Sequence, residues 1–149
     1  MMAQFLSAFS RGAKMQISEL QMNGLAEVVA LWQRVELTRP WNDPRADAEQ
    51  ALRNESSTIL VGHRDGALLA SAMVGFDGHR GWLYYVAVRP ESQGQGLGQQ
   101  IVGAATDWLR RRSVPKVQLM VRSENSQVIR FYEQQGYETQ DIVVLGKRL

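Results

Sequence analysis

The sequence predicts one α+β (mixed α/β) domain built around a single sheet. Its 149 residues, of which 44% are hydrophobic and 21% charged, are enough for one buried core and too apolar for bulk disorder. Three segments with strand patterns follow one another, joined by Asp65-Gly66 and Asp77-Gly78, which are typical of tight hairpin turns. Helical patterns come before and after these segments, so helices and strands are expected to share the core.

In the first part of the chain, residues 15–20 alternate apolar and polar side chains, as a half-buried strand does. Apolar residues at helical spacing predict an amphipathic helix over residues 25–35. Two prolines around a tryptophan indicate a loop over residues 38–44. An aspartate followed three positions later by a glutamine resembles a capping box, so a short helix is expected over residues 47–54.

The middle of the chain is expected to form antiparallel strands over residues 58–64, 67–76 and 81–88, because these segments are rich in β-branched, aromatic and other apolar residues. A glycine-rich turn then leads into a helix over residues 96–112, which carries apolar residues on one face.

The last part of the chain is expected to contain a short strand over residues 116–121 and a helix over residues 126–135. Gly136 is a helix stop, because glycine is common just after the last helical turn. Residues 137–149 are expected to be extended again, with an apolar run over residues 142–145.

Composition and charge exclude several classes of function. The chain has no cysteine for a disulfide, a thiolate metal site or a nucleophile, and its two isolated histidines make no multi-histidine cluster. The net charge of +2 is small, and the run Arg110–Arg112 is more typical of a solvated helix end than of a nucleic-acid site. No apolar run approaches the roughly 20 residues of a membrane span. We therefore expect a cytoplasmic protein with no metal, nucleic acid or membrane as a partner.

Residues 1–14 are expected to be an N-terminal extension to a single domain over residues 15–149. The extension lacks the positive leading region of a signal peptide, although it contains Phe5, Leu6 and Phe9. These apolar residues pack either on the domain that follows or on a neighbouring chain, so the sequence leaves a homodimer open.

The strongest functional signal is the glycine-rich turn Gln93-Gly-Gln-Gly-Leu-Gly98, between a predicted strand and a predicted helix. Glycines let the backbone come close to a ligand, and a helix start offers unpaired N–H groups and the positive end of the helix dipole. The turn lacks the Gly-Lys-Ser/Thr of a Walker loop and the third glycine of a dinucleotide fingerprint. It therefore predicts a pyrophosphate site of another kind, the alternative being a tight connection that binds nothing.

The turn and its surroundings resemble motif A of the GNAT superfamily of N-acetyltransferases, and a later segment is similar to motif B. Motif A is matched by Val86-Ala-Val-Arg-Pro90 and Gln93-x-x-Gly96-x-Gly98, and motif B by Ser123-Glu-Asn125, Phe131-Tyr132-Glu and Gly136-Tyr137. The chain looks most like the YpeA-type bacterial members and, more distantly, the RimI type. The resemblance implies a GNAT-like acyl-CoA N-acyltransferase fold, with a central mixed, mostly antiparallel sheet flanked by about four helices.

The resemblance also implies a site for acetyl-CoA as co-substrate. Backbone groups of Val86, Ala87 and Val88 would hydrogen-bond its pantetheine arm, as an added strand would. The turn would cradle its pyrophosphate through the backbone of Gln93, Gly94, Gln95, Gly96, Leu97, Gly98 and Gln99. Asn125 matches a position that contacts the cofactor arm, although asparagine there is also a preferred helix N-cap.

Tyr132 matches the general acid of the superfamily. A phenol with a pKa near ~10 can protonate a departing thiolate, whose thiol has a pKa near ~8.5, when the two are aligned. By helical spacing alone, Tyr132 would be a core aromatic beside Phe131. The general base is unassigned, because residues 81–88 contain no acidic side chain. The candidates are Tyr84, Tyr85, Asp77 and His79, or a water relay.

These observations predict an N-acetyltransferase that moves an acetyl group from acetyl-CoA to a primary amine of a small molecule or a protein. Direct transfer in a ternary complex is expected, because no cysteine can carry the acetyl group. Trp41, Asp43 and Tyr84 are expected to bind the acceptor, since a carboxylate and an aromatic wall suit a cationic amine. An ordinary loop with Trp41 packed inward is the alternative there. The alternative function is a non-catalytic acyl-CoA-binding or regulatory module on the same fold.

Overall fold

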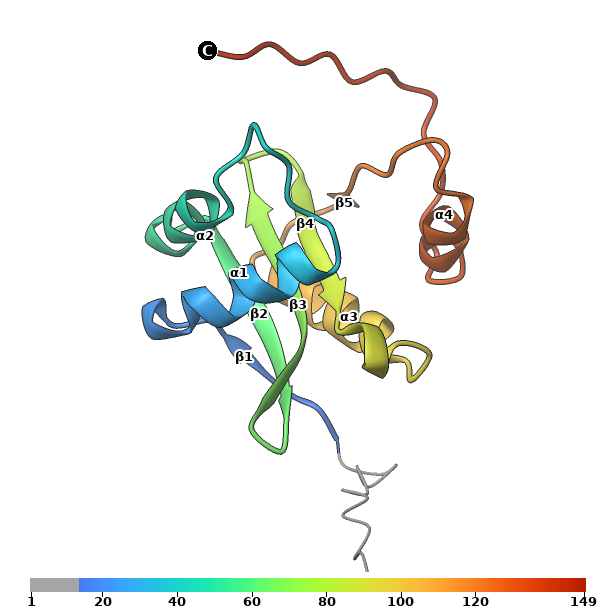
Figure 1. Ribbon diagram of the computed structural model, residues 1–149. Helices are drawn as coiled ribbons and strands as arrows, with labels where there is room; N and C mark the ends of the chain where they lie inside the picture. Colours follow the sequence, from blue (N-terminus) through green and yellow to red (C-terminus); the bar gives the residue numbers. More distant parts are fainter. Residues whose placement is uncertain (1–13) are drawn as a thin grey trace, which may run out of the picture. The chain divides into compact units, whose positions relative to one another are not determined.

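A computed structural model describes residues 14–149, which divide into two units between Leu119 and Met120. The prediction of an N-terminal extension falls, except for Lys14, outside the described residues. The first unit contains the sheet and three α-helices, and the second contains one α-helix and the C-terminal segment (Figure 1).

The sheet of the first unit has five strands in the order β1-β2-β3-β4-β5. The strands are β1 (Gln16–Glu19), β2 (Ser57–Arg64), β3 (Ala67–Phe76), β4 (Gly81–Val88) and β5 (Val117–Gln118). The first four pair antiparallel, whereas β5 pairs parallel to β4. The prediction of a mixed, mostly antiparallel sheet is therefore confirmed.

Two tight turns connect the middle strands, as the sequence predicts. Asp65 and Gly66 both have positive φ, of 51° and 76°, as a hairpin turn matched to the twist of its strands requires. At the second turn, the Asp77 carboxylate accepts hydrogen bonds from the backbone N–H groups of His79 and Arg80, at 2.8 and 2.7 Å. Local turn chemistry thus fixes the register of β2, β3 and β4.

Three helices cover the sheet, with α1 (Leu25–Arg34) and α2 (Pro44–Arg53) on one face and α3 (Leu97–Arg110) on the other (Figure 1). The face under α1 holds an apolar cluster that includes Trp32, which is fully buried. On the opposite face, Leu109 of α3 lies so close to Gly81 of β4 that a Cβ there would be 2.5 Å from its Cδ1.

Two boundaries in the first unit differ from the prediction. Helix α2 begins at Pro44 rather than at residue 47, because the Asp43 carboxylate caps it by accepting from the N–H of Ala46 at 3.1 Å. Proline at the first helical position needs no acceptor for an N–H, so it suits this start. Strand β5 is two residues long rather than six, because its pairing with β4 consists of Gly81↔Val117 and Trp82↔Gln118.

The second unit contains α4 (Ser126–Glu133), which Asn125 caps by accepting from the N–H of Val128 at 3.3 Å. Gly136 follows with φ 88°, as expected of the residue that ends a helix. The prediction of a last strand is wrong for this structure, since residues 137–149 contain no strand. An extended segment becomes a strand only when its backbone groups pair with a neighbour.

Candidate functional site

The glycine-rich turn connects the end of β4 to the first residue of α3. Gly94 and Gly96 have φ of 79° and 77°, a left-handed conformation that other L-residues adopt only at a cost. A Cβ at either glycine would meet no heavy atom within 4 Å, so the space beside both backbones is open. The first N–H groups of α3 also lack intrahelical acceptors. The backbone of the turn therefore has room for an anionic group such as a pyrophosphate.

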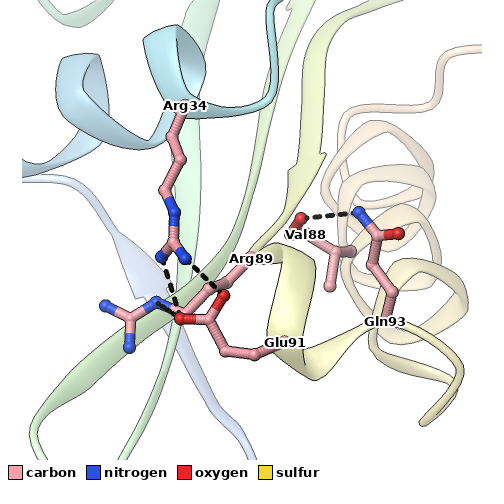
Figure 2. Close-up of polar contacts among 5 residues, drawn as sticks. All are labelled: Arg34, Val88, Arg89, Glu91 and Gln93. Atoms are coloured by element: carbon pink, nitrogen blue, oxygen red, sulfur yellow. Dashed lines mark hydrogen bonds and ion pairs between the residues drawn. The ribbon is translucent and has the colours of Figure 1, made fainter.

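An ion pair ties the beginning of this turn to α1 (Figure 2). Arg34 donates two hydrogen bonds to the carboxylate of Glu91, at 2.8 and 2.7 Å, and Arg89 lies 3.9 Å from the same group. Hydrogen bonds from Arg34 are the main reason why the pKa of Glu91 is lowered. Glu91 belongs to the short 3₁₀ turn η2 (Pro90–Ser92), so this contact holds the chain just before the glycines.

Two further side-chain contacts involve glutamines of the turn. The side-chain amide of Gln93 donates to the carbonyl of Val88 at 3.3 Å, across the bend between β4 and α3 (Figure 2). Arg64, at the end of β2, donates to the Gln95 side chain at 3.0 Å. Arg64 thereby brings a positive charge from another strand to the turn.

Residues 86–88 lie on β4 beside an edge of the sheet that is partly unpaired. Ala87 and Val88 pair with Ser71 and Ala70 of β3 on one side. On the other side, the pairing with β5 involves only Gly81 and Trp82. Within residues 14–119, the outer edge of β4 from Leu83 onward therefore has backbone groups that could pair with an extended ligand.

A β-bulge places two consecutive tyrosines of β4 on the α1–α2 face. Met73 pairs with Tyr84 and Ser71 with Ala87, so one residue of β3 lies opposite two of β4. Tyr85, at the bulge, has φ 49°. Its ring stacks on Trp32 of α1, with centroids 3.9 Å apart. Met73, the partner of Tyr84, packs against the cluster that contains Trp32, so Tyr84 faces the same side.

The bulge is held by hydrogen bonds among residues of four elements, α1, α2, β3 and β4. The indole N–H of Trp32 donates to the hydroxyl of Ser71 at 2.9 Å, and that hydroxyl donates to the Tyr85 carbonyl at 3.0 Å. The Tyr85 hydroxyl donates to the Asp47 carboxylate of α2 at 2.7 Å. Burial, followed by the contact with Asp47, raises the pKa of Tyr85, which therefore keeps its proton at neutral pH.

The three residues expected to bind an acceptor lie on the same side of the sheet or on the loop before α2. Trp41 is 57% exposed, which contradicts the alternative of an inward-packed tryptophan. Asp43 is exposed, and its carboxylate caps α2. Tyr84 is 43% exposed, and its pKa is raised mainly by partial burial.

Asp77, one candidate for the general base, accepts three hydrogen bonds through its carboxylate. Its carboxylate accepts from the backbone N–H groups of Arg80 and His79 and from the indole N–H of Trp82, at 2.7, 2.8 and 3.0 Å. The same contacts, led by that with Arg80, lower the pKa of Asp77 to about 2. A carboxylate so strongly stabilised in its ionised form is a weak proton acceptor.

Tyr132 and Asn125 lie in the second unit. Tyr132 is 8% exposed and has edge-to-face contacts with Phe131 and Tyr137, with ring centroids 4.9 and 5.3 Å apart. Burial raises the pKa of Tyr132, so its phenol stays protonated. Asn125 acts as a helix cap, one of the two roles considered for it, and this contact leaves its amide N–H₂ group available as a donor.

Three contacts at this site are not predictable from the sequence patterns. They are the pairs Arg34–Glu91, Arg64–Gln95 and Asp47–Tyr85. Their members are 57, 31 and 38 residues apart, so no local spacing pattern joins them. The one signal in the sequence for any of these contacts is Asp47, which the sequence pattern identifies as a helix cap rather than as a partner of Tyr85.

Groups that would suggest another kind of site are missing from the described part. No group of three histidine, cysteine, aspartate or glutamate side chains within residues 14–149 could hold a metal ion. In the same range, no helix has the length and apolar character to span a membrane.

Comparisons with known proteins identify similar sequences and similar folds. The model of the acetyltransferase (GNAT) family matches residues 26–137. A protein named as an acetyltransferase from Yersinia enterocolitica is 42% identical over 135 residues, which cover 91% of this chain and 96% of that protein.

Among solved structures, the chain is similar to AAC(6')-Iy, an aminoglycoside N-acetyltransferase, in complex with the bisubstrate analogue CoA-S-monomethyl-acetylneamine. The TM-score is 0.80 at 16% identity, over 92% of this chain and 99% of that chain. A ribosomal-protein-alanine N-acetyltransferase from Brucella melitensis gives a TM-score of 0.73 at 20% identity, over 91% and 99%. At these identities, the similarity concerns the fold.

Proposed function

Because the chain belongs to the acetyltransferase (GNAT) family, we propose that it transfers the acetyl group of acetyl-CoA to a primary amine, directly and within a ternary complex. The observation that carries the proposal is the turn before α3, where Gly94 and Gly96 have left-handed backbones and open space beside them. A diphosphate can approach such a backbone closely. The absence of cysteine supports direct transfer, because no thiol can carry the acetyl group.

In this proposal, the pyrophosphate of acetyl-CoA binds the backbone N–H groups of residues 93–99. Arg64 supports binding there, because its guanidinium lies beside Gln95 and carries the charge opposite to that of the phosphates. The pantetheine arm pairs with the outer edge of β4 along residues 86–88, where the β5 pairing has ended.

The proposed reaction forms a bond between the amine nitrogen and the acetyl carbonyl carbon as the bond from that carbon to sulfur breaks. We assign Tyr132 as the acid that protonates the departing sulfur, and Asn125 as a contact for the cofactor arm. The raised pKa of Tyr132 supports this role, because the phenol carries the proton that a general acid must donate.

The proposed acceptor is a small-molecule amine that is cationic at neutral pH, and Trp41, Asp43 and Tyr84 bind it. The aminoglycoside-type analogue bound by AAC(6')-Iy supports an acceptor of this class. The exposed ring of Trp41 offers a cation–π surface, and the exposed carboxylate of Asp43 offers a negative charge.

The experiment that tests the function combines calorimetry and turnover. Acetyl-CoA should bind the purified protein with a measurable heat, and thiol release should appear with at least one member of a panel of polyamines, aminoglycosides, amino acids and peptide N-termini. Binding without turnover across the panel would contradict the transferase, and no binding would contradict the cofactor site.

The acceptor site is tested by Trp41→Ala and Asp43→Asn. Both should raise KM for the amine while leaving KM for acetyl-CoA unchanged, and loss of the cation–π contact, worth about 0.5–2 kcal/mol, corresponds to about 2- to 30-fold. Asparagine caps helices as well as aspartate does, so Asp43→Asn should keep the stability of α2. Asp65→Asn, at an exposed hairpin turn, is the matched control. An equal rise in both KM values would contradict the assignment.

A further inference from the structure

The packing of the core on this face of the sheet does not depend on the hydrogen bond between Tyr85 and Asp47. The Tyr85 ring already packs on Trp32, and a phenylalanine would fill that place equally well. The hydroxyl instead joins β4 to a carboxylate of α2 at 2.7 Å, in partly buried surroundings. A partly buried hydrogen bond between a carboxylate and a phenol that packing does not require points to a functional role.

The backbone at Tyr85 gives a second, independent reason to look here. A tyrosine with φ 49° inside a strand is an outlier, because the left-handed region is unfavourable for bulky residues. Such strain persists when several contacts enforce it, and it is concentrated at functional sites. The contacts are the stack on Trp32 and the hydrogen bonds from Ser71 and to Asp47. The bulge lies directly before residues 86–88, where the proposed thioester arm binds.

Counting hydrogen-bond capacity shows what the Tyr85 hydroxyl can still do. A phenol has one proton to donate, and here Asp47 accepts it. The lone pairs of the same oxygen remain able to accept a hydrogen bond from an N–H group. The ionisable groups that act on Tyr85 are Asp47 and Asp43, from α2 and its cap, whereas α1 presents the uncharged ring of Trp32. These two carboxylates attract a cationic amine, and their negative charge favours a proton that moves from it onto them.

We propose that Asp47 is the general base of the transfer and that Tyr85 relays the proton to it. One N–H proton of the bound ammonium passes to the Tyr85 hydroxyl oxygen as the proton of that hydroxyl passes to the Asp47 carboxylate, which leaves a lone pair on the nitrogen. The nitrogen then bonds to the acetyl carbon, and the C–S bond breaks. The sulfur takes the proton of Tyr132 and leaves as the thiol, and the second N–H proton lost by the nitrogen replaces the proton that Tyr132 gave. No oxidant or further reactant is needed. This inference rests on the proposed acetyl transfer and identifies the base that sequence analysis left unassigned.

Two conservative variants test the relay. Asp47→Asn removes the proton acceptor and keeps the shape, and Tyr85→Phe removes the relay oxygen and keeps the ring on Trp32. In an active wild type, each should lower kcat at pH 7 by about 100-fold or more, with an unchanged calorimetric Kd for acetyl-CoA. The double variant should lose no more activity than either single variant, because both act on one proton path. Glu49→Gln, on the same helix and paired with Arg45 and Arg53, is the control and should keep wild-type activity.

The pH dependence separates a proton path from a structural role. An alkylamine has a pKa near ~10, so raising the pH supplies the unprotonated amine without a base. The kcat of both variants should therefore rise steeply toward pH 10 and approach that of the wild type. Variants that keep wild-type kcat, or whose loss is the same at every pH, would overturn the relay. A wild type that transfers acetyl to no amine would instead overturn the proposed function itself.

If Asp47→Asn fails to fold, Tyr85→Phe alone decides, since its ring contact with Trp32 is retained. Recovery at high pH supports the relay, and absence of recovery overturns it.

Discussion

Replacing Gly96 by valine should separate the cofactor site from the stability of the fold. Gly96 has φ 77°, and placing an L-residue in the left-handed region costs about 1–2 kcal/mol. Since no heavy atom lies within 4 Å of a Cβ at this position, no clash within the protein adds to that cost. For a chain of this length, about 1–2 kcal/mol corresponds to a fall in Tm of about 2–8 °C. The variant should therefore fold.

The effect on acetyl-CoA binding should be much larger. The valine side chain occupies the space that a diphosphate needs to reach the backbone, so at least two charge-assisted hydrogen bonds, each worth about 1.5–3 kcal/mol, are lost. This corresponds to a rise in Kd of about 100-fold or more, measured by calorimetry.

Gly66→Val is the matched control for this experiment. Gly66 has φ 76° and equally open space, but it lies in the β2–β3 hairpin turn, so the same loss of Tm should come with an unchanged Kd. If Gly96→Val bound acetyl-CoA as tightly as the control does, the placement of the pyrophosphate at this turn would be refuted.

Three other perturbations have defined outcomes. Tyr132→Phe should lower kcat by about 10²- to 10⁴-fold without changing acetyl-CoA affinity. The control Tyr137→Phe should keep the kcat of the wild type. If rate assays gave Tyr132→Phe the same kcat as the wild type, Tyr132 would be a packing residue. Arg64→Gln should raise the Kd for acetyl-CoA about tenfold at low salt and less at 1 M salt, and a salt-independent effect would argue against a charge contact. Because Arg34 lowers the pKa of Glu91 below 4.5, the carboxylate stabilises the fold above that pH. The Tm difference between wild type and Glu91→Gln should therefore vanish in scans as the pH falls through the folded pKa, and a difference that persists in acid would show a contact not based on charge.

The sequence predicts those parts of the fold that short segments encode. The two hairpins follow from Asp65-Gly66 and Asp77-Gly78, whose backbone preferences act over four residues. The predicted start of α2 is too late, because the pattern at Asp47 resembles a cap, whereas Asp43 followed by proline is the cap that forms. The strand expected over residues 137–149 depends on a pairing partner, which composition does not specify.

The candidate site is predictable to the extent that it depends on backbone conformation. Gly94 and Gly96 indicate a left-handed turn before a helix, and the structure has that turn. The side chains around it are not predictable from one sequence, because Arg64 and Asp47 reach their partners across elements distant in the chain. The bulge at Tyr85 is also not predictable, since the sequence of β4 is compatible with regular alternation.

The hydroxyl of Ser71 has a consequence for which mutations the protein can tolerate. This fully buried group accepts from Trp32 and donates to the Tyr85 carbonyl, so one oxygen serves a donor on α1 and an acceptor on β4. Alanine would leave both groups unsatisfied, at about 1–3 kcal/mol each, and threonine would force a methyl group into a packed interior. In a random-mutagenesis screen for activity, position 71 should therefore accept few residues other than serine. Substitutions there would abolish activity in the same way as substitutions in the active site, although Ser71 acts through the structure.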